Sequence, residues 1–201
     1  MKEIVVATAN PGKLREIKDA LQGMEVEIAS LRDLSPISST PLEIEEDGKT
    51  FQENALKKAR KVARLTNRFS IADDSGLEVD CLLGQPGVRS ARFAGEEALD
   101  ATNNSKLLQL MEGVPPAQRG ASFRCVIAIV DPQGKEAWVE GECRGVIGDR
   151  ERGDQGFGYD PLFLLPELGK TLAELPLEVK NRLSHRGKAL AALKEVLADF
   201  F

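Results

Sequence analysis

The sequence predicts an α/β protein in which helices cover a β-sheet, and three stretches carry this prediction. Residues 3–8 form a β-branched run that is followed closely by apolar residues at helical spacing, as in a strand, a tight loop and a helix. Residues 50–63 begin with a helix-capping pattern, and residues 122–143 contain two long strand-like runs around a short turn. We expect the strand-like runs to supply a sheet that the helices cover.

The composition is that of an ordinary folded chain, with 201 residues and a net charge of −5. This length fits one domain, or one domain with two lobes, and can bury roughly 70% of the unfolded surface, so no metal or disulfide is needed as a staple. The negative charge argues against a general nucleic-acid or anionic-membrane surface, because such binding depends on clustered Lys and Arg. The three cysteines lie far apart, which favours reduced thiols in a cytoplasmic protein. We expect neither a signal peptide nor a membrane span, since the longest core-like run, 126–130, is too short to cross a bilayer.

The first strand ends in a tight loop that leads into a helix over residues 11–21. Asn10, Pro11 and Gly12 favour a sharp turn, and Lys13 falls in the first helical turn, where unpaired backbone amides and the helix dipole attract anions. The pattern is shorter than a Walker loop. A phosphate site and an ordinary turn with a solvent-facing lysine both remain open.

An acidic cluster precedes the best-marked helix of the chain. A short strand is expected at residues 26–29, and four acidic side chains follow within residues 43–47. Residues 50–53 then have the form of a capping box, and an apolar stripe continues through residues 51–63. Acidic residues at this place commonly stabilise the helix dipole, but they also offer a carboxylate for a metal site.

Two adjacent carboxylates, Asp73 and Asp74, interrupt the apolar stretch of residues 70–79. We interpret this stretch as a strand, a polar corner at residues 73–76, and a second strand. Neighbouring side chains of an extended segment point to opposite faces, so the two carboxylates should have different roles. Hard oxygen ligands at a strand end suit Mg²⁺. The structural alternative is an Asx-turn with solvated carboxylates.

The next segments alternate between loops and regular elements. Residues 84–95 are rich in turn formers and carry two arginines, which indicates an ordered loop that could close over a ligand. Residues 98–112 have helical apolar spacing. Residues 122–130 and 136–143 predict a β-hairpin around a turn with Pro and Gly.

The last part of the chain holds a glycine-rich loop at residues 153–161, followed by a helix to the C-terminus. Phe157 lies between two glycines. If its ring were exposed there, the free energy of burying it would be lost unless a planar group such as a nucleobase stacked on it. Packing of Phe157 in the core is an equally open alternative. Lys180 precedes His185 and Arg186, which stand at the start of the last helix. The single histidine is either a satisfied structural residue or, with Arg186, a donor pair that reads a base carbonyl.

Taken together, these motifs resemble the inosine triphosphate pyrophosphatase family over essentially the whole chain. The resemblance is carried, in order, by residues 8–13, 45–55, 72–77, 86–95, 157–161 and 184–187. It implies an elongated mixed α/β fold, a single domain of residues 1–201 with two lobes and the active-site groove between them, commonly as a homodimer. It also implies Mg²⁺-dependent hydrolysis of ITP, dITP and XTP to the monophosphate and pyrophosphate.

The resemblance further implies a role for each matching residue. The phosphates would be held by Thr8, Ala9, Asn10, Pro11, Gly12 and Lys13. The metal would be held by Glu45 and Asp74, and Asp74 would also accept a proton from the attacking water. The substrate would be contacted by Ser75, Phe157, Gly158, Tyr159, Asp160, Lys180, His185 and Arg186. Glu46 leaves the first metal ligand open by one residue, and Arg89 stands where the family often has an aromatic.

Two rival functions share part of this pattern. A related pyrophosphatase for other modified nucleotides would use the same metal and phosphate chemistry. A non-catalytic nucleotide-binding module would keep Lys13 and the base-reading loop but would not need the carboxylates of Glu45 and Asp74. For the preferred reading, donors from His185 and Arg186 would recognise the six-position oxygen of hypoxanthine and xanthine and disfavour adenine.

Overall fold

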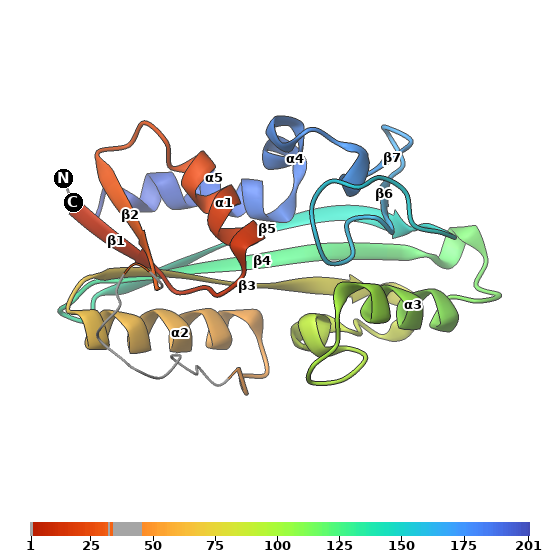
Figure 1. The fold of residues 1–201 in the computed structure, drawn as a ribbon, viewed down its shortest axis with the longest axis horizontal. Coiled ribbons are helices and arrows are strands. Elements are labelled where there is room, and N and C mark those ends of the chain that lie inside the picture. The colour runs from red at the N-terminus through yellow and green to blue at the C-terminus, as the bar shows by residue number, and fades with distance from the viewer. Residues whose placement is uncertain (1, 32, 34–45) are drawn as a thin grey trace. The chain divides into compact units, whose positions relative to one another are not determined.

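The computed structural model describes residues 2–31, 33 and 46–201 and has the predicted α/β composition (Figure 1). The strands are β1 (Lys2–Val6), β2 (Val26–Ser30), β3 (Phe69–Val79), β4 (Gly120–Val130), β5 (Glu136–Ile147), β6 (Phe163–Leu165) and β7 (Lys170–Thr171). The helices are α1 (Pro11–Ala20), α2 (Phe51–Thr66), α3 (Asp100–Leu110), α4 (Leu177–Leu183) and α5 (His185–Leu197). The strands form one sheet in the order β2-β1-β3-β4-β5-β6-β7. It contains parallel and antiparallel pairs, so the expected mixed sheet is confirmed.

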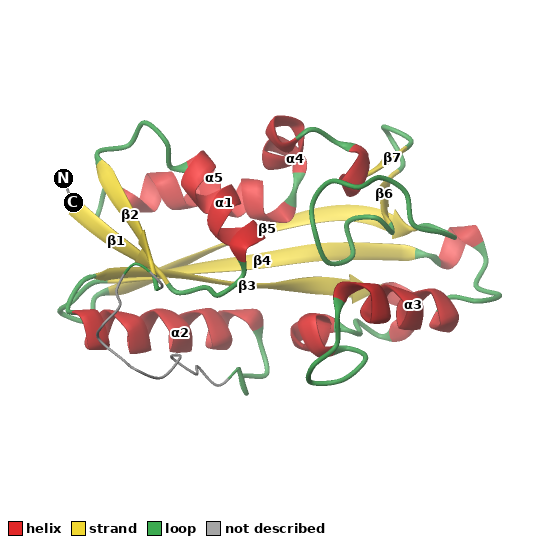
Figure 2. Cartoon of the chain, in the orientation of Figure 1, coloured by secondary structure: helices red, strands yellow, loops and turns green. Residues whose placement is uncertain are grey.

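By their internal contacts the residues divide into two compact units. The first unit comprises Met1–Asp74, Cys125–Gly141 and Ala189–Phe201. In it, β1 pairs in parallel with both β2 and β3, as the strand, loop and helix pattern requires. Helices α1 and α5 lie on one face of its strands and α2 lies on the other (Figure 2). On the α1 and α5 face the core is formed by a cluster that includes Ile4, Ile17, Ile71, Ile127 and Leu193.

The second unit comprises Ser75–Arg124 and Glu142–Lys188. Its core cluster gathers buried side chains from β3, α3, β4, β5, β6 and the loop before β6, among them Leu77, Leu107, Phe123, Ile147 and Tyr159. Strand β6 pairs antiparallel with β5 and with β7. Among the residues that the structure describes, no helix is both long and apolar enough to cross a membrane.

The polar corner predicted at residues 73–76 is wrong, because β3 runs without interruption from Phe69 to Val79. An Asx-turn forms when polar side chains bond to their own backbone. Here the side chains of Asp73, Asp74 and Ser75 instead have partners on other elements. With their polar groups satisfied in this way, the residues keep the extended backbone of their neighbours.

The longer predicted elements are confirmed. Helix α2 begins after Thr50, whose hydroxyl accepts a hydrogen bond from the Glu53 backbone, as the capping pattern indicates. Strands β4 and β5 are neighbours in the sheet, and the turn between them closes with a hydrogen bond from the Gly134 backbone N–H to the Asp131 carbonyl. Strands β6 and β7 and helix α4 were not predicted. They span two to seven residues, too few for a periodic pattern to show.

Candidate active site

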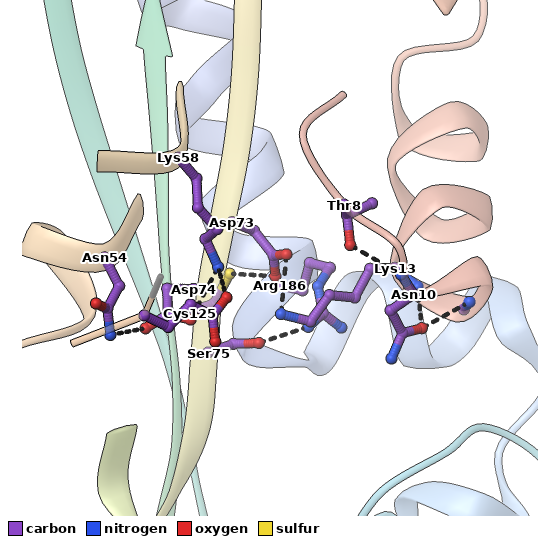
Figure 3. Close-up of polar contacts among 12 residues, drawn as sticks. Thr8, Asn10, Lys13, Asn54, Lys58, Asp73, Asp74, Ser75, Cys125 and Arg186 are labelled. Atoms are coloured by element: carbon purple, nitrogen blue, oxygen red, sulfur yellow. Dashed lines mark hydrogen bonds and ion pairs between the residues drawn. The ribbon is translucent and has the colours of Figure 1, made fainter. Parts of the chain in front are cut away.

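The two adjacent carboxylates of β3 have separate sets of partners, as their alternation along the strand predicts (Figure 3). Asp73 pairs with Lys13 of helix α1, at 3.0 Å between Oδ1 and Nζ. Asp74 pairs with Lys58 of helix α2, at 3.1 Å between Oδ1 and Nζ. Since α1 and α2 cover opposite faces of the first unit, the strand presents one acid to each layer of helices.

Lys58 bridges two carboxylates. Its ammonium lies 2.6 Å from Oε1 of Glu46 and 3.1 Å from Oδ1 of Asp74. The side chains of Lys58 and Asp74 are each only 8% exposed, whereas that of Glu46 is 31% exposed. Glu46, in the segment before α2, is therefore tied to the strand carboxylate through one buried cation.

Asn54 provides a second link between the residues just before α2 and β3. Its side-chain amide donates to Oδ2 of Asp74 at 3.1 Å, and its oxygen accepts the Gly48 backbone N–H at 2.8 Å. A Cβ added to Gly48 would lie 2.5 Å from that same oxygen, so only glycine fits this approach. Asn54 is fully buried, and both ends of its amide group are hydrogen-bonded. This arrangement fixes which way the Asp74 carboxylate faces.

The charges of this cluster shift two pKa values. Burial raises the pKa of Asp74, and the nearby Lys58 and Lys13 only partly offset that effect. Burial alone would lower the pKa of Lys58, but the carboxylates of Asp74 and Glu46 outweigh it and raise the pKa. Lys58 therefore stays an ammonium, while Asp74 holds a proton more readily than an exposed aspartate does.

The loop before α1 is held by its own side chains. Oδ1 of Asn10 accepts the backbone N–H groups of Gly12 and Lys13, at 2.8 Å and 3.1 Å, and so caps the helix. The Thr8 hydroxyl accepts the Asn10 backbone N–H at 3.2 Å. Lys13 lies in the first turn of the helix, as the sequence predicts, and its ammonium contacts Asp73. The Cys125 thiol lies 3.7 Å from the other oxygen of Asp73 and donates to it.

Ser75 and the start of α5 meet within the second unit. Nη2 of Arg186 donates to the Ser75 hydroxyl at 2.8 Å, and Arg186 is almost fully buried. His185 is also buried, and its ring stacks on Phe123 at 4.6 Å between centroids. Two of the residues expected to contact substrate, Ser75 and Arg186, are therefore in direct contact with each other.

The glycine-rich loop is organised around Asp160. Its Oδ2 accepts the Phe157 backbone N–H at 3.0 Å and pairs with Lys180 at 2.8 Å, in an ion pair whose side chains are almost fully buried. Gly156 has a φ of +84°, and a Cβ added to it would lie 2.2 Å from the same oxygen. The Phe157 ring lies 4.9 Å from the Lys180 ammonium and 5.4 Å from the Arg186 guanidinium carbon. Phe157 therefore lies against two cations and is not packed only among apolar side chains.

The rest of this loop is fastened to its surroundings. The Gly158 N–H donates to Asp100 at 2.7 Å, and its carbonyl accepts from Asn104 at 3.2 Å. Tyr159 is buried in the core of the second unit, and its hydroxyl donates to the Ser90 carbonyl at 2.8 Å. Burial raises the pKa of this phenol. The Tyr159 hydroxyl thus holds the glycine-rich loop to the Ser90 backbone within the core of the second unit.

A divalent cation fits the chemistry of the acidic cluster. Glu45, the expected first ligand, lies outside the described residues. Within the described part of the chain no group of three or more acidic, Cys or His side chains is placed to hold a metal, but Glu46 and Asp74 share the single cation of Lys58. The Lys58 ammonium is a positive charge between two carboxylates. Carboxylates are hard oxygen donors, which are the ligands that Mg²⁺ prefers.

Asn54 and Lys58 are the candidate site residues that the sequence reasoning missed. Both fall inside the apolar stripe of α2, one at each of two successive helical turns, and both are buried. A buried amide and ammonium need polar partners, so polar residues inside an otherwise apolar stripe were the available signal. The signal was hidden because lysine and asparagine are common on exposed helix faces.

Comparison with known proteins identifies the class to which this fold and these motifs belong. The profile of the Ham1 family matches residues 4–196. A curated relative from Geobacter sulfurreducens, named dITP/XTP pyrophosphatase, is 55% identical and covers 98% of this chain and 97% of its own length. A second from Desulforamulus reducens with the same name is 51% identical and covers 97% of this chain and 95% of its own. A solved HAM1 protein from Coxiella burnetii has a TM-score of 0.87 at 41% identity, over 99% of this chain and 100% of that one.

The chain therefore belongs to the Ham1 family. This result confirms the family expected from the ordered motifs and agrees with the mixed α/β fold.

Proposed function

We propose that this chain is a Mg²⁺-dependent nucleoside triphosphate pyrophosphohydrolase. Its substrates would be the deaminated purine nucleotides ITP, dITP and XTP, which it would cleave to the nucleoside monophosphate and pyrophosphate. The observation that carries this proposal is the cluster of Glu46 with the buried Asp74 and Lys58, in a chain whose relatives at about half identity are named dITP/XTP pyrophosphatases. The nucleotide pool, rather than a nucleic acid or a membrane, would be its target.

Asp74 would accept the proton of the attacking water. The water oxygen bonds to the α-phosphorus, the bond from that phosphorus to the bridging oxygen breaks, and pyrophosphate leaves with the bond electrons. Asn54 keeps one oxygen of Asp74 in place. Burial raises the pKa of Asp74 towards the range in which a carboxylate is an effective base.

Mg²⁺ would be held by Asp74 together with Glu45 or its neighbour Glu46. When bound, the metal would offset negative charge on the phosphates and on the pyrophosphate leaving group. The support for this site is the pair of carboxylates that Lys58 already holds together.

The loop of residues 8–13 would bind the phosphates. Asn10 caps α1 and so preorganises the loop. Lys13 places an ammonium at the first turn of α1. Preorganised donors stabilise developing charge without a further cost of rearrangement.

The base and sugar would be contacted by two groups of residues. Phe157 would stack on the purine, and Gly158, Tyr159, Asp160 and Lys180 would shape the surrounding loop. Ser75, His185 and Arg186 would contact the nucleotide, the last two by donating to the six-position oxygen. Dimerisation is proposed from the family resemblance. A cytoplasmic location is proposed from the three cysteines, which lie far apart in the sequence and fit reduced thiols.

A substrate panel tests this function. Purified protein would be incubated with ITP, dITP, XTP, ATP, GTP and a methylated pyrimidine triphosphate, with Mg²⁺ or with EDTA. We expect the first three to give monophosphate and pyrophosphate only with Mg²⁺, and inorganic phosphate to appear only after an inorganic pyrophosphatase is added. Preferred cleavage of the pyrimidine nucleotide would indicate the related pyrophosphatase, and binding without turnover would indicate a nucleotide-binding module.

A further inference from the structure

The ammonium of Lys58 occupies the place where two acidic side chains converge. It contacts Glu46 and Asp74 at 2.6 Å and 3.1 Å, and its side chain is 8% exposed. The two carboxylates carry two negative charges and the lysine carries one positive charge. The cluster is thus partly neutralised before any metal binds, by a cation that is part of the protein.

A resident cation opposes a second cation at the same oxygens. A divalent ion that binds Glu46 and Asp74 must weaken their contacts with Lys58 and must also lie close to its positive charge. Both effects are large in a buried site, where charges are poorly screened by solvent.

We propose that Lys58 competes with the divalent metal for the carboxylates of Glu46 and Asp74, so that metal and nucleotide load together rather than one after the other. The inference rests on the proposed function, since it takes these carboxylates as the metal site. It assigns to Lys58 a positioning role: the lysine keeps the acidic pair assembled and partly neutralised until the substrate arrives.

Nucleotide relieves the competition because it supplies another anion. A triphosphate brings several negative charges, which offer the displaced ammonium a new partner and also attract the metal. Metal and nucleotide should therefore strengthen each other's binding, by the same factor whichever is added first. Without Lys58, the acidic pair alone should attract the metal strongly, and the metal should need the nucleotide less.

The test measures Mn²⁺ binding to the full chain without nucleotide, by electron paramagnetic resonance of the free ion. Lys58→Met should bind Mn²⁺ at least about 10-fold more tightly than the unmodified protein, because it removes a competing charge. Lys57→Met is the matched control: it removes the same charge one residue away, from an exposed pair with Asp47 at 2.5 Å. This control should bind Mn²⁺ as the unmodified protein does.

A second arm measures the coupling itself. Mn²⁺ binding would be repeated with a saturating α,β-methylene analogue of ITP, which cannot be cleaved at the bond in question. The analogue should tighten Mn²⁺ binding to the unmodified protein by a larger factor than in Lys58→Met. Lys58→Arg keeps the charge and should retain weak Mn²⁺ binding in the absence of nucleotide.

The outcomes separate this inference from the proposed function. Equal or weaker Mn²⁺ binding by folded Lys58→Met, or tighter binding by Lys58→Arg, would overturn the competition even if the unmodified protein hydrolyses dITP. Absence of Mg²⁺-dependent turnover in the unmodified protein would overturn the function whatever the Mn²⁺ data show. Circular dichroism checks folding, and Lys58→Gln, whose amide can still donate to Asp74, carries the test if Lys58→Met does not fold.

Discussion

Lys13 and Asp73 form an ion pair with unequal burial: the aspartate side chain is fully buried, and the lysine side chain is 16% exposed. The pair joins the first turn of α1 to the centre of β3, with 3.0 Å between the charged atoms. Removing either partner takes the ion pair away from the other charge, but only the lysine has a flexible stem and a path towards solvent.

The first prediction follows from this asymmetry. Lys13→Met should lower the free energy of unfolding by about 3 kcal/mol or more, because it breaks an ion pair whose carboxylate is fully buried. Asp73→Asn should cost clearly less, since Lys13 can turn towards water. Urea denaturation of both variants and of the double variant gives the test, and the double variant should be more stable than the sum of the two single losses predicts, by about 1 kcal/mol. Equal single losses that simply add would contradict the asymmetry.

The second prediction concerns Asp74 as the base. Asp74→Asn should reduce kcat for dITP by at least about 10²-fold, in line with the contribution of a general base, while nucleotide binding largely persists. Rapid-quench turnover and isothermal titration with the uncleavable analogue measure the two quantities. Asp47→Asn, an exposed acid paired with Lys57, is the control and should leave kcat unchanged. Near-normal turnover of Asp74→Asn would reject the assignment.

The third prediction tests Asn54 as the group that orients Asp74. Asn54→Asp keeps the acceptor for Gly48 but replaces the donor to Asp74 with a second carboxylate. We expect a loss of about 1–3 kcal/mol in the free energy of unfolding, because a hydrogen bond becomes a repulsion between buried charges. Gln52→Glu, the same chemical change two residues away on α2, should cost much less. Similar thermal melting curves for both variants would rule out the orienting role.

How much of this site could be read from the sequence depended on the distance between partners along the chain. The capping of α2 by Thr50 is local, and the sequence predicts it. The sequence also predicts a sharp turn at Asn10, but not that Asn10 caps α1. The opposite directions of Asp73 and Asp74 follow from strand alternation alone. The sequence did not predict that β3 continues without interruption. The partners of its polar side chains come from helices that are distant in sequence.

The same reason explains the missed bridge. Lys58 lies 12 residues from Glu46 and 16 from Asp74, so its double pairing appears only when α2 packs on the sheet. For Asp160, the sequence showed a glycine-rich loop but not the buried pair with Lys180, 20 residues away. Local patterns thus identified which segments matter, and packing decided which side chains meet.

The fourth prediction concerns base selection by Arg186. Arg186→Ala should reduce the preference for ITP over ATP by at least about 10-fold in kcat/KM, because the six-position oxygen loses a donor that adenine cannot use. The variant also removes the hydrogen bond to Ser75 and the contact with the Phe157 ring, so its fold must be checked by circular dichroism. Arg182→Ala, an exposed arginine on α4, serves as the control. An unchanged ITP to ATP ratio would refute the base contact.

The fifth prediction uses the pH dependence of stability at Glu174. Its carboxylate accepts the Thr171 backbone N–H at 2.8 Å and pairs with Arg152 at 2.9 Å. The hydrogen bond from the Thr171 backbone, with the help of Arg152, holds the pKa of Glu174 below the ordinary 4.5 of a glutamate. Replacing Glu174 with Gln should therefore lower Tm at pH 7, where the carboxylate is ionised in both states.

The sign of the pH effect follows from proton uptake. As pH falls below 4.5, the unfolded chain takes up a proton at Glu174 before the folded protein does, so the stabilisation is lost as pH falls through the lower folded pKa. The Tm difference between the unmodified protein and Glu174→Gln should thus be constant above pH 6 and shrink below pH 4.5. Glu167→Gln removes an exposed carboxylate nearby in the chain, is the control, and should change Tm little at pH 7. A Tm difference for Glu174→Gln that grows on acidification would mean that the folded protein takes up the proton first, opposite to what the Thr171 hydrogen bond requires.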